Sequence, residues 1–202
     1  MSSLASAPSR LVLADRLGAR SVVTNIAFIL GGAVVTAAAA QISIPMWPVP
    51  ITGQTFAVLL VGTTLGMWRG LASMLTYVAL GAIGLPVFTG AQGGLDSLTG
   101  GPTVGYIIGF VLAGALTGWM AQRGFDRSLW GAIGIFLAGE AVIYSVGLPW
   151  LAVFLANAGA ENDLAATLSA GLYPFIIGDL IKAALAGLLF PATWKLVNRR
   201  QR

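Results

Sequence analysis

The chain has 202 residues, of which 57% are apolar and 9% are charged, and its formal net charge is +4. Soluble domains have about a quarter of their residues charged, so this composition excludes an ordinary water-soluble globule and indicates a membrane protein. The sequence contains neither Cys nor His, which excludes disulfides, thiol and imidazole catalysis, and metal sites built on these residues. Lys182 and Lys195 are its only lysines, and neither belongs to a Gly-Lys-Ser/Thr phosphate-binding loop. The sequence implies no cofactor.

Six membrane-spanning helices are predicted in one bundle. The first, Ser21 to Ile44, is uncharged and would form roughly 36 Å of helix, enough to cross a bilayer. A secretory signal is the competing interpretation, but the run is long for one and continues into more apolar sequence. The other five spans are expected at Thr55 to Trp68, Gly70 to Leu85, Thr103 to Gln122, Ser128 to Phe154 and Leu172 to Val197.

The second and third spans are short for a full crossing. We expect the adjoining outer loops, residues 45–54 and 86–102, to complete the crossing as folded structure that protein covers. The domain organisation is then a basic N-terminus (1–20), a six-helix substrate-binding domain (21–197) and a basic tail (198–202). The three outward-running helices are expected to end at or just before Pro45, Pro86 and Pro149, because proline lacks the N–H that a helix needs.

The distribution of basic residues predicts the orientation of the bundle. Lys and Arg near span ends stay on the cytoplasmic side of a membrane. If six helices alternate, one face collects ten basic residues while the opposite connections hold none, only Asp96, Glu161 and Asp163. Both termini are therefore expected in the cytoplasm. The ten residues are Arg10, Arg16, Arg20, Arg69, Arg123, Arg127, Lys195, Arg199, Arg200 and Arg202.

The two outer loops are candidates for a binding site. Three prolines stiffen residues 45–54, and Trp47, Thr52 and Gln54 offer an aromatic face and hydrogen-bonding groups, which suits a lid. The alternative for Trp47 is an anchor at the lipid interface. Residues 81–105 contain eight glycines, which allow the backbone to approach a ligand closely or simply make a flexible connection.

Three ionisable residues lie inside apolar helices: Glu140, Asp179 and Lys182. Each costs on the order of 3 kcal/mol to place at mid-membrane, so each calls for a partner or a wet cavity. Counting from the expected outer helix ends places all three in the outer half of the bundle. Because Asp179 and Lys182 are three residues apart, they share a helix face and could hold a small polar group or only neutralise each other.

Other residues in these helices allow more than one role. Glu140 could be a counter-charge for Lys182, an ion or proton site, or a satisfied carboxylic acid. Tyr144, one turn further on, faces the same way, and Tyr106 is a further candidate near the outer start of its helix. Ala33 and Ala37 form a small-x-x-x-small row in the first span, which indicates close packing within the bundle or a docking face for another membrane subunit.

Three stretches of the chain resemble the BioY family, the biotin-binding subunits of energy-coupling-factor (ECF) transporters. They are Pro48 to Phe56 (PVPITGQTF), Gly100 to Tyr106 (GGPTVGY) and Tyr173 to Lys182 (YPFIIGDLIK). The likeness covers almost the whole chain, with one departure at Val104, where glycine would be expected. The resemblance implies a multi-pass protein of the bacterial cell (inner) membrane that captures biotin from outside. It also implies a transmembrane coupling subunit and ATP-binding subunits as partners, and a transporter subunit rather than an enzyme.

The chemistry of the charged pair agrees with this ligand. The ureido ring of biotin offers two N–H donors and a carbonyl acceptor, which Asp179 and Lys182 could meet. The carboxylate tail would need hydroxyl, amide or backbone donors, for which Thr52, Gln54, Gln92 and the glycine loop are candidates. Two alternatives stay open: an ECF-type capture subunit for another vitamin, and a stand-alone proton-coupled carrier that uses Glu140 and Asp179.

Overall fold

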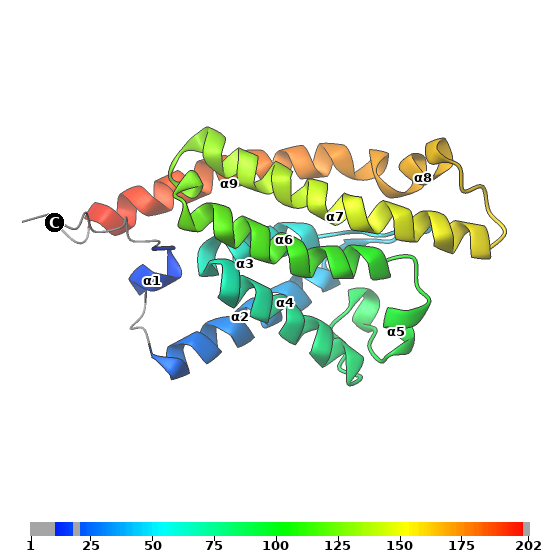
Figure 1. Cartoon of the computed structure of the whole chain (residues 1–202), viewed down its shortest axis with the longest axis horizontal. Helices are drawn as coiled ribbons and strands as arrows, with labels where there is room; N and C mark the ends of the chain where they lie inside the picture. Colours follow the sequence, from blue (N-terminus) through cyan, green and yellow to red (C-terminus); the bar gives the residue numbers. More distant parts are fainter. Residues whose placement is uncertain (1–10, 18–20, 200–202) are drawn as a thin grey trace, which may run out of the picture.

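The computed structural model describes residues 11–17 and 21–199 and consists mainly of helices (Figure 1). Beside the helices there is one hairpin, in which strand β1 (Ser43–Ile44) pairs antiparallel with β2 (Ile51–Thr52). The long helices are α2 (Val22–Gln41), α3 (Gln54–Leu65), α4 (Met67–Ala82), α6 (Val104–Gln122), α7 (Leu129–Asn157) and α9 (Tyr173–Arg199). The short ones are α1 (Ala14–Leu17), η1 (Thr89–Ala91), α5 (Asp96–Thr99), η2 (Phe125–Arg127) and α8 (Leu164–Gly171).

Within the described residues, a long helix lies at the position of each predicted span. Four of these helices, α2, α6, α7 and α9, are long and apolar enough to cross a membrane, while α3 and α4 are shorter. The bundle has two ends (Figure 1). We call the end with the hairpin, α5 and α8 the cavity end, and the end with α1 and the last turns of α9 the terminal end. The expected domain limits at 1–20 and 198–202 fall partly outside the described residues.

The expectation that a helix ends at Pro149 is wrong. Helix α7 continues through Pro149 to Asn157, and α9 likewise contains Pro191. Proline is tolerated inside membrane helices, because neighbouring helices and Ser or Thr side chains can satisfy the carbonyl that loses its partner. The expectation holds for the other two helices, since α2 ends at Gln41 and α4 at Ala82, shortly before Pro45 and Pro86.

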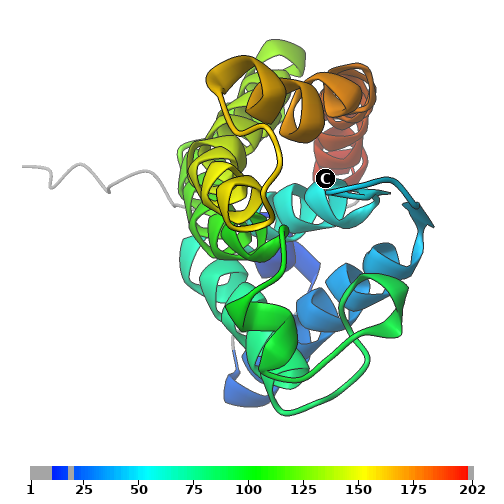
Figure 2. The same ribbon diagram turned by 90° about the vertical axis from the view of Figure 1, so that its right-hand side faces the viewer.

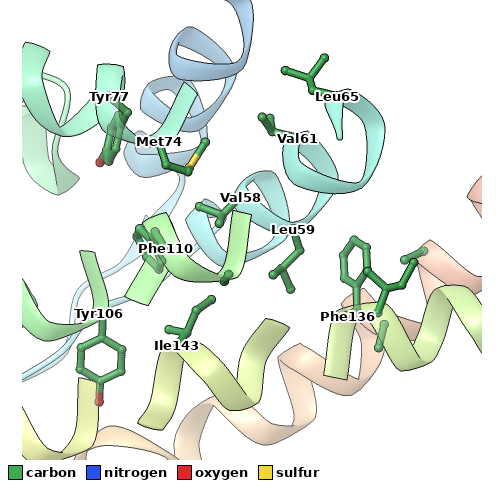
Figure 3. Close-up of a cluster of buried hydrophobic side chains, with 14 of the residues drawn as sticks. Val58, Leu59, Val61, Leu65, Met74, Tyr77, Tyr106, Phe110, Phe136 and Ile143 are labelled. Atoms are coloured by element: carbon green, nitrogen blue, oxygen red, sulfur yellow. The ribbon is translucent and has the colours of Figure 1, made fainter. Parts of the chain in front are cut away.

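Helix α6 runs through the middle of the bundle, with α7 and α9 on one side and α2, α3 and α4 on the other (Figure 1). Its contact with α3 and α4 is made by glycines. A Cβ on Gly62 would lie 2.5 Å from the carbonyl oxygen of Gly114, and one on Gly118 would lie 2.3 Å from the carbonyl carbon of Gly66. Small residues let helices approach closely where no water drives them together. Apolar side chains of α3, α4, α6 and α7 fill the space around these contacts (Figure 3).

Two glutamines hold the loop after α4 at the cavity end. The side-chain amide of Gln41 donates to the carbonyl oxygen of Phe88 at 3.0 Å, and its oxygen accepts from the N–H of Ala91 at 3.0 Å. Gln54 donates to the Tyr77 hydroxyl at 2.6 Å, and its oxygen accepts from Thr89 at 2.9 Å. The prediction that this outer loop is folded rather than flexible is therefore confirmed at these positions.

The terminal end is closed by contacts between segments far apart in the sequence. Nε1 of Trp194 in α9 donates to Oδ2 of Asp126 at 2.6 Å, and the Arg127 guanidinium lies 4.8 Å from the Trp194 ring centroid. Asp15 in α1 forms an ion pair with Arg69 in α4. Val12 is fully buried in the core. Part of the expected basic N-terminus is thus packed onto the bundle.

Candidate substrate-binding site

A charged pair on α9 forms the polar centre of the candidate site. Nζ of Lys182 donates to Oδ1 of Asp179 at 2.9 Å and to the Thr55 hydroxyl of α3 at 2.7 Å. The Tyr144 hydroxyl of α7 donates to Oδ2 of the same carboxylate. The Asp179 side chain is only 8% exposed and that of Lys182 only 17%. Three helices therefore fix both charges, and the predicted shared helix face is confirmed.

A cavity of about 660 Å³ opens beside this pair. Its volume lies within the range of roughly 300–1,000 Å³ that is typical of small-molecule sites. Tyr106, Ile107, Phe110 and Phe175 make an aromatic and aliphatic wall, and Lys182 contributes the one cationic group among the lining residues. From the hairpin and the outer loops come Ser43, Pro45, Met46, Pro48, Val49, Pro50, Thr52, Phe88, Thr89, Gly90, Gln92, Asp96, Ser97, Gly101 and Pro102. The arrangement offers a polar end and an apolar wall to one ligand.

Several predicted site residues line this cavity. Thr52, Gln54, Gln92, Tyr106 and Tyr144 do so together with Lys182. The oxygen of Gln54 already accepts from Thr52 at 3.1 Å as well as from the loop, so this side chain mainly holds the loop in place. Tyr106 is also anchored, because its hydroxyl donates to the Gly171 carbonyl oxygen at 2.9 Å. Its ring remains available to the cavity.

Three predicted site residues are absent from the cavity lining: Trp47, Glu140 and Asp179, whose carboxylate lies behind Lys182 and Tyr144 of the lining and is bonded to both. Trp47 is 68% exposed, which is the placement expected of an interface anchor rather than of a lid residue. Glu140 is buried, and neither of its carboxyl oxygens has a hydrogen-bond partner among the described residues. It lies within electrostatic reach of Asp179 and Lys182. The expected depth of Glu140, counted from a helix end at Pro149, is wrong because α7 continues to Asn157. The expected grouping of Glu140, Asp179 and Lys182 in space is confirmed.

Sequence reasoning missed Thr55, which binds the Lys182 ammonium across 127 positions of sequence. It also missed Phe175 and Asp96 as cavity residues. Thr55 and Phe175 stand inside the stretches that carried the family resemblance, so the motif contained them without indicating their roles. Asp96 had been noted only for its effect on charge distribution.

The proposed docking residues differ in their surroundings. Ala33 is 1% exposed, so its methyl group packs inside the bundle and the packing alternative applies to it. Ala37 is half-buried against the core. Beside it, α2 exposes a broad apolar surface that includes Leu30, Val34 and Val35.

The fold and the site define a multi-pass helical membrane protein with a ligand-sized cavity at one end of its bundle. The BioY family model matches residues 9–199. The biotin transporter BioY of Thermotoga maritima is 41% identical over 150 residues, which cover 74% of this chain and 83% of the relative. That of Rhodobacter capsulatus is 40% identical over 149 residues, covering 70% and 76%. The chain belongs to the BioY family.

A solved structure agrees with this assignment. The S-component for biotin from an ECF-type ABC transporter superimposes with a TM-score of 0.69 at 27% identity, covering 91% of this chain and 96% of that one. These relatives are named as transporters or transporter components, in line with the expectation that the chain is not an enzyme.

Proposed function

We propose that this chain captures biotin at the cavity end and delivers it as the substrate-specific subunit of an ECF transporter. The observation that carries the proposal is the Asp179–Lys182 pair, held by Thr55 and Tyr144 beside a cavity of ligand size. A carboxylate and an ammonium 2.9 Å apart present an acceptor and a donor side by side. The ureido ring of biotin needs an acceptor for its N–H group and a donor for its carbonyl oxygen, and the pair presents both.

Each part of biotin has a matching region of the cavity. Asp179 accepts from a ureido N–H and Lys182 donates to the ureido carbonyl, each charge-assisted bond contributing about 1.5–3 kcal/mol. The thioether ring packs against Phe110 and Phe175, where burial of apolar surface contributes roughly 25 cal/mol per Å². The tail extends toward Thr52 and Gln92 at the hairpin and the outer loop.

The proposed topology has six helices crossing the membrane, with the terminal end in the cytoplasm. Its support is the charge distribution, because all described basic residues except Lys182 belong to segments at the terminal end: Arg16, Arg69, Arg123, Arg127, Lys195 and Arg199. Helices α3 and α4 are too short to cross alone, and the hairpin and the loop after α4 extend them at the cavity end. The cavity then opens to the outside, where the vitamin is captured.

We further propose that the exposed face of α2, which Ala37 borders, docks the transmembrane coupling subunit. Replacing Ala37 with leucine adds bulk to a contact that small residues keep close, and it should abolish co-purification with the ECF module. Biotin affinity should stay unchanged, because Ala37 is not part of the cavity lining. The matched control is Ala184→Leu on the exposed face of α9, which should retain the complex. Retention of the complex by Ala37→Leu would exclude this face.

A titration of the detergent-purified protein with biotin, followed by tryptophan fluorescence, tests the capture function. Saturable binding of biotin, together with no binding of riboflavin or thiamine at the same concentrations, is the expected result. Binding of another vitamin in place of biotin would favour the first alternative. Uptake by the lone protein in vesicles, without ATP and abolished by an uncoupler, would favour a proton-coupled carrier.

A further inference from the structure

Charge is unevenly distributed over the cavity. Its lining contains one cation, Lys182, at the deep end, and one anion, Asp96, which lies in the exposed outer connection. Nζ of Lys182 already donates hydrogen bonds to Asp179 at 2.9 Å and to Thr55 at 2.7 Å. The cation therefore serves the end of the cavity where the ureido ring is proposed to bind.

Among the described residues, no Lys or Arg lies in the connections around the mouth of the cavity. The three connections at the cavity end, residues 42–53, 83–103 and 158–172, contain no Lys or Arg in the sequence. Their charged residues are Asp96, Glu161 and Asp163. Figure 2 shows these connections surrounding the cavity end, with the hairpin, α5 and α8 at its rim. A ligand carboxylate that reaches this rim meets acidic groups and no counter-ion.

Three of the hydroxyl groups at the mouth are already engaged within the protein. Thr52 and Thr89 both donate to the oxygen of Gln54, and Ser97 donates to the Gly93 carbonyl oxygen at 3.2 Å. The remaining side-chain donors among these lining residues are neutral: the hydroxyls of Ser43 and Thr103 and the Gln92 amide. Neutral donors bind either an amide carbonyl or a carboxylate. The carboxylate makes the stronger hydrogen bond but loses more hydration on binding, and the adjacent Asp96 opposes it alone.

We infer that the site recognises the ureido ring and does not recognise the charge of the tail, so that it accepts biotin whose carboxylate is amide-linked as readily as free biotin. This rests on the proposed function and extends its substrate class to biotinamide and Nε-biotinyl-lysine. The cavity of about 660 Å³ reaches the exposed residues Gly90, Gln92 and Asp96, so an amide substituent can extend out of the mouth.

The test is a set of equilibrium titrations of the purified full chain with biotin, biotinamide and Nε-biotinyl-lysine. The three dissociation constants should agree within about threefold, because exposed charges at the mouth are screened by salt. An amide that binds tenfold or more weakly than biotin would overturn the inference while leaving biotin capture intact. Failure of all three ligands to bind would overturn the proposed function itself.

A variant at the mouth gives a second readout. Asp96→Asn should tighten binding of biotin about twofold to threefold at low salt and leave biotinamide unchanged, because only the free acid carries the charge that Asp96 repels. The matched control is Glu161→Gln, which removes an acidic group at the same end that does not line the cavity. Equal effects of Asp96→Asn on both ligands would contradict the electrostatic argument.

Discussion

Replacing Lys182 with alanine should weaken biotin binding by roughly tenfold to a hundredfold, the largest effect that we expect from a single side chain in the cavity. The substitution removes one charge-assisted hydrogen bond to the ureido carbonyl, worth about 1.5–3 kcal/mol. It also leaves Asp179, whose side chain is 8% exposed, without the ammonium that balances it at 2.9 Å. Both consequences weaken the same end of the site. Titration of the purified variant followed by tryptophan fluorescence measures the change.

The control for this prediction is Lys195→Ala, because Lys195 is an exposed lysine near the terminal end of the same helix. Its biotin affinity should equal that of the wild type. Asp179→Asn is the complementary variant: it keeps the shape of the side chain and replaces one acceptor oxygen by a donor, so a loss of tenfold or more is expected again. Wild-type affinity in both Lys182→Ala and Asp179→Asn would exclude this pair as the binding site.

The helices could be predicted from the sequence because membrane spans are encoded locally. Long uncharged runs and the segregation of Lys and Arg were sufficient to place all six long helices within a few residues of the observed bounds. The helix end at Pro149 could not be predicted in this way. Whether proline stops a helix in a membrane depends on neighbouring helices, which the local sequence does not reveal.

The charged pair was also predictable, since a spacing of three residues puts two side chains on one helix face. Its partners were not. Thr55 lies 127 positions from Lys182, and Tyr144 lies 35 positions from Asp179. The same holds for the outer loops: the hairpin and η1 depend on the contacts of Gln41 and Gln54 with residues far along the chain. Only the folded chain brings such groups together.

The glycine contact inside the bundle leads to the second large expected effect. Replacing Gly118 with alanine should destabilise the protein severely, because the new methyl carbon would lie 2.3 Å from the carbonyl carbon of Gly66 and 2.4 Å from the amide nitrogen of Met67. These are backbone atoms of the turn between α3 and α4, so no side chain can rotate to make room. Overpacking costs about 1–3 kcal/mol even where side chains adjust. We expect the upper end of this range or more.

The measurement is thermal unfolding in detergent, where a loss of about 3 kcal/mol corresponds to roughly 10 °C for a chain of this size. The matched control is Gly134→Ala in α7, because a methyl group there would have no heavy atom of another segment within 4 Å. Its melting temperature should stay within about 2 °C of the wild type, since alanine suits a helix at least as well as glycine. Because α3 carries Thr55 and α6 carries Tyr106, separating these helices should also weaken biotin binding. Wild-type melting of Gly118→Ala would show that α6 can move away from the turn at little cost, and that this close contact does not hold the site together.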